Sequence, residues 1–232
     1  VKRPEVKEDD RADLPKAAIE LAENPTPPSH EWFVKSKQWK PAVQAYLASS
    51  TFTDAQVGRV MAALDKSAYA KNTIVVLWSD HGFHLGEKQR WAKQSLWERS
   101  TRVPFVVLLP GQREGQTCAK PVELLSVYPT LVKLCGLPAR DELEGVDLSP
   151  LLKDAKAAWD RPAITTYQQN NHAVRSEHFR YIRYADGSEE LYDHRDDPHE
   201  WRNIASAPEH KQTIAEHAKW LPKVNVPDAR GK

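Results

Sequence analysis

Three residues just after an apolar run combine side chains suited to binding a metal ion and an anion. Asp80, His81 and Gly82 come after the run TIVVLW, residues 73–78. A carboxylate is a good ligand for a hard divalent cation, and the adjacent imidazole can ligate, form a hydrogen bond or hold a leaving-group oxygen. Glycine frees the backbone for a sharp exit. The same residues also suit a simple turn, in which Asp80 caps the backbone and His81 is merely exposed.

The loop that follows is basic and contains large aromatic side chains. It holds His84, Lys88, Arg90, Lys93 and Arg99 together with Trp91 and Trp97. A lysine aimed at an ester oxygen neutralises the charge that develops during sulfuryl or phosphoryl transfer. An ordinary solvated lysine explains the pattern equally well. Nucleic-acid binding is disfavoured, because the cluster is one short loop with no recognisable nucleic-acid module around it.

The apolar runs on both sides of this loop predict the elements that position it. TIVVLW and VPFVVLLP, residues 103–110, are continuous and rich in β-branched side chains. Such runs are expected of strands buried on both faces of a mainly parallel sheet. Helical spacing precedes them between residues 40 and 70, where it predicts a helix packed on one side, and follows them from Val122 to Leu134. The alternation predicts an α/β fold with ligand sites beyond the carboxyl ends of its strands.

The two ends of the chain have different patterns. Residues 1–41 are rich in charge and proline, which predicts irregular structure with a short helix around Leu14 to Ala22. After Pro150 the short alternating segments predict an antiparallel sheet, with a closing helix between Pro208 and Leu221. We therefore predict a catalytic-domain part over residues 1–155 and a C-terminal α+β subdomain over residues 156–232.

Composition narrows the classes of function. The 232 residues carry 33 Lys and Arg against 32 Asp and Glu, a formal charge of +1, so no broad field attracts nucleic acid or a membrane surface. No apolar run is long enough to predict a membrane span. Cys118 and Cys135 lack the spacing of a zinc site and predict two buried or half-buried thiols. The charged N-terminus without an initiator methionine is typical of a fragment.

Three segments of the chain carry a family resemblance: TFTDAQVGRVMAALDKSAYAKNTIVVLWSDHGFHLGEKQRWAKQSLWERSTRVPFVVLLPG, VELLSVYPTLVKLCGLP and ELYDHRDDPHEWRNIA. In this order they resemble the sulfatases of the alkaline-phosphatase superfamily, most closely the iduronate-2-sulfatase-like group. It extends from about Tyr46 to Ala205, and the ordered series is more specific than any single block. It implies the C-terminal portion of an alkaline-phosphatase-like sandwich, a hydrolase of sulfate esters on a carbohydrate such as a glycosaminoglycan, and a secreted, periplasmic or lysosomal protein.

The resemblance implies a separate role in metal binding, sulfate binding or the substrate pocket for each candidate residue. Asp80 is expected to be a calcium ligand, and His81 a second ligand or a close catalytic neighbour. Lys93 is expected to contact the sulfate ester as a catalytic and substrate-binding residue. His84 and Trp91 are candidates for shaping the substrate pocket.

The nucleophile that the family uses has no counterpart here. It is a formylglycine made from Cys or Ser in the signature C/S-x-P-x-R, and the segment Cys135 to Arg140 misses that signature because its proline comes one place too late. The early strand with paired aspartates is also missing, and calcium wants about six to eight oxygen ligands. We therefore expect an isolated chain that is inactive and a missing N-terminal half in cis or in trans. A phosphonate or phosphate monoester hydrolase of the same superfamily, or a non-catalytic remnant that binds sulfated sugar, remains open.

Overall fold

The computed structural model of the chain describes residues 1–23, 27–112 and 114–227. It contains two compact units, Val1–Glu114 and Gly115–Lys232. The predicted boundary at residue 155 falls inside the second unit. Contacts explain the difference, because Glu123 accepts a hydrogen bond from the backbone N–H of Ile164 at 2.9 Å and Pro121 accepts one from the Trp159 indole at 3.0 Å. Residues on both sides of the predicted boundary are therefore tied together.

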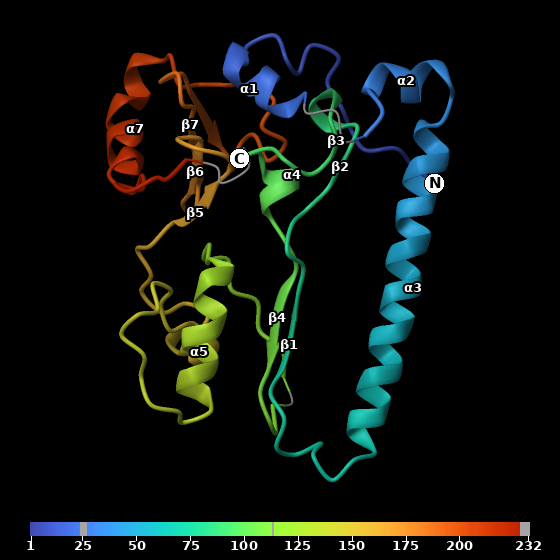
Figure 1. Cartoon of the computed structure of the whole chain (residues 1–232), viewed down its shortest axis with the longest axis vertical. Coiled ribbons are helices and arrows are strands. Elements are labelled where there is room, and N and C mark those ends of the chain that lie inside the picture. The colour runs from blue at the N-terminus through green and yellow to red at the C-terminus, as the bar shows by residue number, and fades with distance from the viewer. Residues whose placement is uncertain (24–26, 113, 228–232) are drawn as a thin grey trace. The chain divides into compact units, whose positions relative to one another are not determined.

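The N-terminal unit begins with three helices, which are followed by short strands with a 3-10 helix and a short α-helix among them (Figure 1). In chain order they are α1 (Lys16–Ala22), α2 (His30–Lys35), α3 (Trp39–Asp65), β1 (Val75–Trp78), β2 (His84–Leu85), the 3-10 helix η1 (Glu87–Gln89), β3 (Trp91–Ala92), α4 (Glu98–Thr101) and β4 (Phe105–Leu108). The predicted short helix near Leu14 is confirmed as α1. A second helix, α2, was not predicted; Ser29 caps it by accepting a hydrogen bond from the N–H of Trp32 at 3.2 Å.

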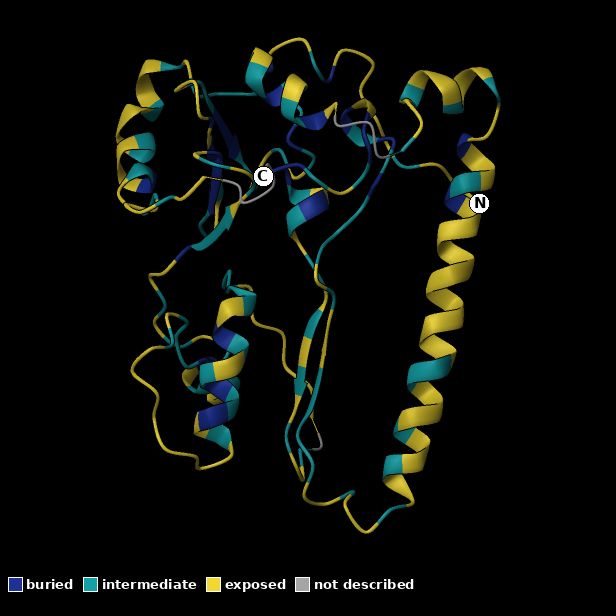
Figure 2. Ribbon diagram, viewed as in Figure 1, coloured by how far each residue is buried: buried dark blue, intermediate teal, exposed yellow. Residues whose placement is uncertain are grey.

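Helix α3 confirms the predicted helix, but its apolar stripe is not packed as expected. Proline is tolerated at Pro41 because the first turn of a helix does not use that N–H. Val60 is 68% exposed, and Figure 2 shows most of the helix in the exposed colour. Periodicity identifies which face of a helix is apolar, yet it does not say what covers that face.

Strands β1 and β4 correct two details of the prediction. They pair antiparallel, with Val75 opposite Leu108 and Trp78 opposite Phe105, whereas a mainly parallel sheet was expected. Trp78 is 50% exposed, so the strand is not buried on both faces within the described residues. The apolar runs predicted strands correctly, because β-branched residues favour extended backbone, but they do not specify strand direction. The mixed α/β class itself is confirmed.

The C-terminal unit is built around a four-stranded antiparallel sheet, as predicted. Its elements are the 3-10 helix η2 (Leu124–Ser126), α5 (Val127–Leu134), α6 (Ser149–Lys153), β5 (Ala163–Thr166), β6 (His172–Arg175), β7 (Phe179–Arg183), β8 (Glu189–Asp193), the 3-10 helix η3 (Pro208–His210) and α7 (Lys211–Ala218). The strands lie in the order β5-β6-β7-β8. Helix α7 covers one face of this sheet, where Ile214 and Ala218 pack against a core of Val174, Tyr181 and Leu191.

The two cysteines of this unit differ from expectation. Both thiols are exposed and neither forms a disulfide. Cys135 lies immediately after the last residue of α5, and helix ends turn toward solvent.

A buried histidine makes the stability of this unit depend on pH. His217 of α7 forms hydrogen bonds with the Thr213 carbonyl at 2.7 Å and the Ser176 hydroxyl at 2.8 Å. Burial lowers its pKa from the ordinary value of 6.5. The unfolded chain takes up this proton near 6.5 while the folded chain resists it. Stability is therefore full above that pH and falls below it.

We expect the urea midpoint of the wild-type protein to fall more between about pH 7.5 and about pH 5 than that of His217→Gln. Urea unfolding followed by circular dichroism measures both. The exposed His178 provides the control, because His178→Gln should keep the wild-type slope. Equal slopes for wild type and His217→Gln would contradict the assignment.

Candidate functional site

The predicted Asp80–His81 pair follows strand β1 with one residue, Ser79, between them. The Ser79 hydroxyl donates to the His81 carbonyl at 2.8 Å, which fixes the turn. The Asp80 side chain is 79% exposed, and one of its carboxylate oxygens lies 3.4 Å from Nε2 of His81. The two side chains therefore meet at one place, and the carboxylate is accessible to an ion from solvent.

The orientation of the His81 ring determines which nitrogen can act. Nδ1 lies 2.7 Å from the carbonyl oxygen of Gly82. A carbonyl can only accept, so Nδ1 carries the proton and Nε2 of the neutral ring presents its lone pair. This is the nitrogen that faces Asp80, and it is suited to ligating a metal ion or accepting a proton.

Gly82 is required by a close approach of two backbone segments. Its N–H donates to the Ser100 carbonyl at 2.8 Å. A Cβ placed on Gly82 would lie 2.1 Å from the carbonyl oxygen of Arg99 and 2.9 Å from that of Arg102. These are backbone atoms, which cannot move aside as a flexible side chain can. The residues around α4 are thereby held against the turn that carries Asp80 and His81.

We expect Gly82→Ala to destabilise the protein by about 3 kcal/mol, because the new methyl group cannot be accommodated without backbone movement. Thermal or urea unfolding measures the effect. Gly58→Ala is the matched control, since nothing lies within 4 Å of a Cβ at that position in α3. That control should be stabilising by about 0.5–1 kcal/mol, as expected for Gly to Ala in a helix. A Gly82→Ala protein as stable as wild type would refute the close approach.

Lys93 is brought back toward this turn by the hairpin of β2 and β3. His84 pairs with Ala92 in this antiparallel hairpin. Lys93 therefore lies one residue beyond the pair, on the same side as His81. The side chain is exposed and forms no ion pair within the described residues. No hydrogen bond joins it to Asp80 or His81 there. Its ammonium group is thus available to an anion.

His84, a predicted substrate contact, lies inside the structure. It has no exposed surface, and its Nε2 and Nδ1 lie 3.0 Å from the Ser95 hydroxyl and 3.2 Å from the Glu87 carbonyl. Ser95 in turn donates to the Ser100 hydroxyl at 2.8 Å. This geometry favours a role in holding the loop over one in touching substrate.

Trp91, the other predicted pocket residue, is also buried. It is 4% exposed, stacks on Phe33 with ring centroids 3.7 Å apart, and donates from its indole to Nδ1 of His30 at 3.1 Å. Trp39 belongs to the same apolar cluster, and its indole donates to the Leu85 carbonyl at 2.7 Å. The residues before α3 therefore pack on the loop that carries Lys93.

A buried ion pair in this region was missed from the sequence. Lys88 and Asp10 are joined at 3.0 Å, with side chains 3% and 2% exposed. The sequence places Lys88 only in the basic cluster, and no spacing rule connects it with a residue as far away in the chain as Asp10. Burial cannot be recognised from charge alone, because most lysines and aspartates are exposed.

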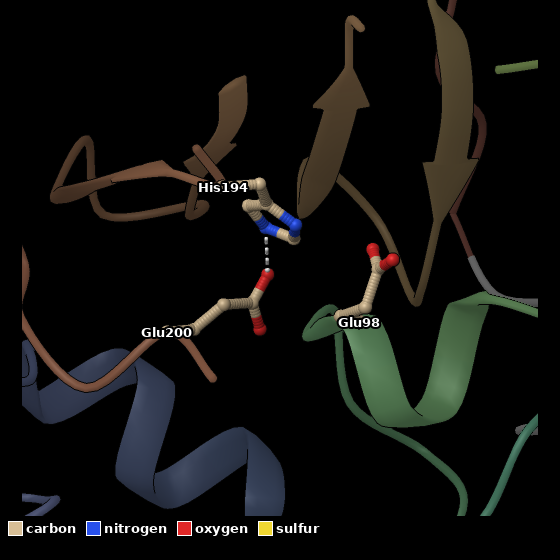
Figure 3. Close-up of side chains that lie close together, drawn as sticks. All are labelled: Glu98, His194 and Glu200. Atoms are coloured by element: carbon tan, nitrogen blue, oxygen red, sulfur yellow. Dashed lines mark hydrogen bonds and ion pairs between the residues drawn. The ribbon is translucent and has the colours of Figure 1, made fainter. Parts of the chain in front are cut away.

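The C-terminal unit contains a second buried polar cluster that sequence reasoning missed. Figure 3 shows the hydrogen bond between His194 and Glu200, whose Nε2 and carboxylate oxygen are 3.0 Å apart. Glu200 is also paired with Arg180 at 2.6 Å, both side chains being buried, and Arg175 lies 3.0 Å from Nδ1 of His194. Figure 3 also labels Glu98, which belongs to the N-terminal unit. Because an arginine balances the charge of Glu200, we interpret this cluster as structural.

Two protein-family models match this chain. The sulfatase family model matches residues 5–137, and the model for the C-terminal part of N-sulphoglucosamine sulphohydrolase matches residues 86–226. A sulfatase of Formosa agariphila is 44% identical over 97% of this chain, which spans 45% of that relative. The chain therefore covers less than half of this curated relative.

Two solved structures extend the comparison. A 2-O GAG sulfatase has a TM-score of 0.76 at 24% identity, over 95% of this chain and 51% of its own, which shows a shared fold. A protein solved in complex with its substrate, D-glucosamine-2-N,6-O-disulfate, has a TM-score of 0.69 at 25% identity over 80% of this chain and 40% of its own. With the family model matching more than half of its length, this chain belongs to the sulfatase family.

Proposed function

We propose that this chain supplies the metal- and sulfate-binding part of a sulfuric ester hydrolase that acts on a sulfated carbohydrate. The observation that carries the proposal is the exposed Asp80–His81 pair after β1, followed by a hairpin that brings the backbone of Lys93 back toward it. The exposed Lys93 side chain forms no ion pair within the described residues. The sulfatase relative and the neighbour that binds a sulfated glucosamine support the substrate class. A sulfated glycosaminoglycan fragment is the substrate we favour.

Asp80 and His81 have suitable chemistry for part of a calcium shell. The accessible carboxylate is a hard oxygen ligand, and Nε2 of His81 lies close enough to it to serve the same ion or a neighbouring oxygen. A calcium ion bound there would supply positive charge that polarises the sulfate group. Two side chains do not complete a shell of about six to eight ligands, so the remaining ligands would come from other parts of the enzyme.

Lys93 and His81 would act directly on the ester. The Lys93 ammonium would hold a sulfate oxygen and stabilise the negative charge that builds up on the group during transfer. In its protonated form, His81 would donate a hydrogen bond from Nε2–H to the bridging oxygen and transfer that proton to it as the bond to sulfur breaks. Both roles use groups with few competing partners in the described structure, in contrast to the buried His84.

The nucleophile would come from a part of the enzyme that precedes this chain. A formylglycine in that part would supply the attacking oxygen, as the family resemblance implies. We therefore expect the 232-residue chain alone to have no sulfatase activity, whether the N-terminal half is joined to it or binds as a separate chain.

This proposal is tested by comparing the isolated chain with the extended enzyme, meaning this chain together with the N-terminal part that carries the nucleophile. Release of sulfate is measured from an aryl sulfate and from a sulfated glucosamine. We expect turnover only by the extended enzyme. Turnover of phosphonate esters in preference to sulfate esters would instead favour a phosphonate monoester hydrolase. Tight calcium-independent binding of sulfated oligosaccharide without turnover by either protein would favour a binding remnant.

A further inference from the structure

The loop that carries Lys93 has a strained backbone. Four of its non-glycine residues have positive φ angles, which are 51° at Lys88, 51° at Gln89, 65° at Ala92 and 72° at Gln94. The last two are the immediate neighbours of Lys93. Such a conformation costs about 1 kcal/mol or more for each residue that has a side chain. The loop therefore keeps this shape only if contacts elsewhere hold it.

The strongest of these contacts is the buried pair of Asp10 and Lys88. One carboxylate oxygen of Asp10 accepts from the Lys88 ammonium at 3.0 Å, and the other accepts from the Lys88 backbone N–H at 3.1 Å. A single carboxylate thus fixes both the side chain and the main chain of a residue in the left-handed conformation. The Lys88 ammonium also lies 5.5 Å from the centre of the Trp97 ring.

Further hydrogen bonds hold the loop residues between Lys88 and Lys93. Gln89 donates from its side-chain amide to the Glu8 carbonyl at 3.3 Å, which adds a second link to the N-terminal segment. Arg90, itself buried, donates from its guanidinium to the Lys93 carbonyl at 2.9 Å. A continuous set of contacts therefore runs from Asp10 through residues 88–90 to the backbone of Lys93.

We propose that Asp10 and Lys88 are positioning residues that hold Lys93 where it can meet the sulfate group. This inference rests on the proposed function of Lys93 and adds to it. The charged N-terminal segment, whose pattern predicts only irregular structure, then contributes to catalysis by fixing the loop without touching the substrate. Displacing a catalytic group by about 1 Å can lower a rate by about 100-fold, so a positioning contact of this kind has a measurable effect.

A double-mutant cycle separates positioning from general stabilisation. It uses wild-type extended enzyme, Asp10→Asn, Lys93→Ala and the double variant, with kcat and KM measured for an aryl sulfate. We expect Asp10→Asn to lower kcat/KM by about 10- to 100-fold in the wild-type background. In the Lys93→Ala background it should change kcat/KM by less than about 3-fold, because there is no longer a lysine to position. Equal losses in both backgrounds would overturn the proposal.

Two further variants keep the experiment decisive. Asp9→Asn is the control, because Asp9 is adjacent in sequence but 66% exposed, and its partner Lys7 is an exposed residue 3.2 Å away. It should leave kcat/KM unchanged. If Asp10→Asn does not fold, the combined change Asp10→Asn and Lys88→Met removes both charges and leaves no buried charge without a partner, and the same cycle is run with it.

The outcomes also distinguish this inference from the proposed function. If Lys93→Ala alone has wild-type kcat/KM, the role of Lys93 is wrong and the positioning role falls with it. If Lys93→Ala is strongly impaired but the cycle is additive, Lys93 keeps its role and only the positioning role is overturned.

Discussion

Replacing Lys93 with alanine should lower kcat/KM of the extended enzyme for sulfate esters by about 1,000-fold. A charged donor aimed at a transferring group stabilises the transition state more than the ground state, so most of the loss should appear in kcat. The side chain is exposed, and we expect the unfolding temperature to change by less than about 2 °C. Steady-state kinetics and thermal unfolding of the same preparations measure both quantities.

The control for this experiment is Lys71→Ala. Lys71 is also an exposed lysine of the same compact unit, and it precedes the strand that leads to Asp80. Its removal should leave kcat/KM within about 2-fold of wild type, because an exposed charge away from the site contributes little. A Lys93→Ala enzyme with wild-type kcat would mean that another group holds the sulfate.

Removing the calcium ion should lower the activity about as strongly as Lys93→Ala does. The calcium concentration that the enzyme needs should depend on Asp80. We expect a calcium chelator to abolish sulfate release by the extended enzyme and added calcium to restore it. Asp80→Asn should need a calcium concentration at least about 100-fold higher for half-maximal activity, because an amide oxygen lacks the charge of a carboxylate ligand. Activity is measured over a calcium titration at constant ionic strength.

Thermal unfolding provides a second readout for the same prediction. An ion that binds only the folded protein raises its stability in proportion to the logarithm of the free ion concentration. Calcium should therefore raise the unfolding temperature of the wild-type extended enzyme and have a much smaller effect on Asp80→Asn. Asp54→Asn, a change at an exposed position of α3, is the control and should respond as wild type does. Chelator-resistant activity in the wild-type enzyme would contradict the metal assignment.

The sequence predicted those features that depend on local pattern. Continuous β-branched residues predicted strands β1 and β4, the alternation after Pro150 predicted the antiparallel sheet, and helical spacing after Pro208 predicted the helix that covers it. Asp80 and His81 were chosen as ligand candidates because ligand groups collect after strands, and their role as ligands stays a prediction. Strand direction was missed, because the run TIVVLW has no feature that distinguishes a parallel neighbour from an antiparallel one.

Long-range contacts could not be predicted in the same way. The shared loop with Lys93 predicts that His84 and Trp91 line a substrate pocket, but both side chains are buried. Trp91 stacks on Phe33 of α2, and His84 is held by Ser95 and lies beside the Trp97 ring. Asp10 is one of several acids in a charged segment, and only the folded chain shows that it is the one buried with Lys88. These residues support the loop, and their substrate contacts remain predictions. No helix in the described parts of the chain is long and apolar enough to cross a membrane.

The most direct test of the account is a crystal structure of the extended enzyme with calcium and a slowly hydrolysed sulfate ester. We predict that an Asp80 carboxylate oxygen ligates the ion at about 2.4 Å and that the Lys93 ammonium lies about 3 Å from a sulfate oxygen. A sulfate ester bound with Lys93 directed away from it, or a metal ion bound without Asp80, would contradict the assignment of this chain as the metal- and sulfate-binding part of the site.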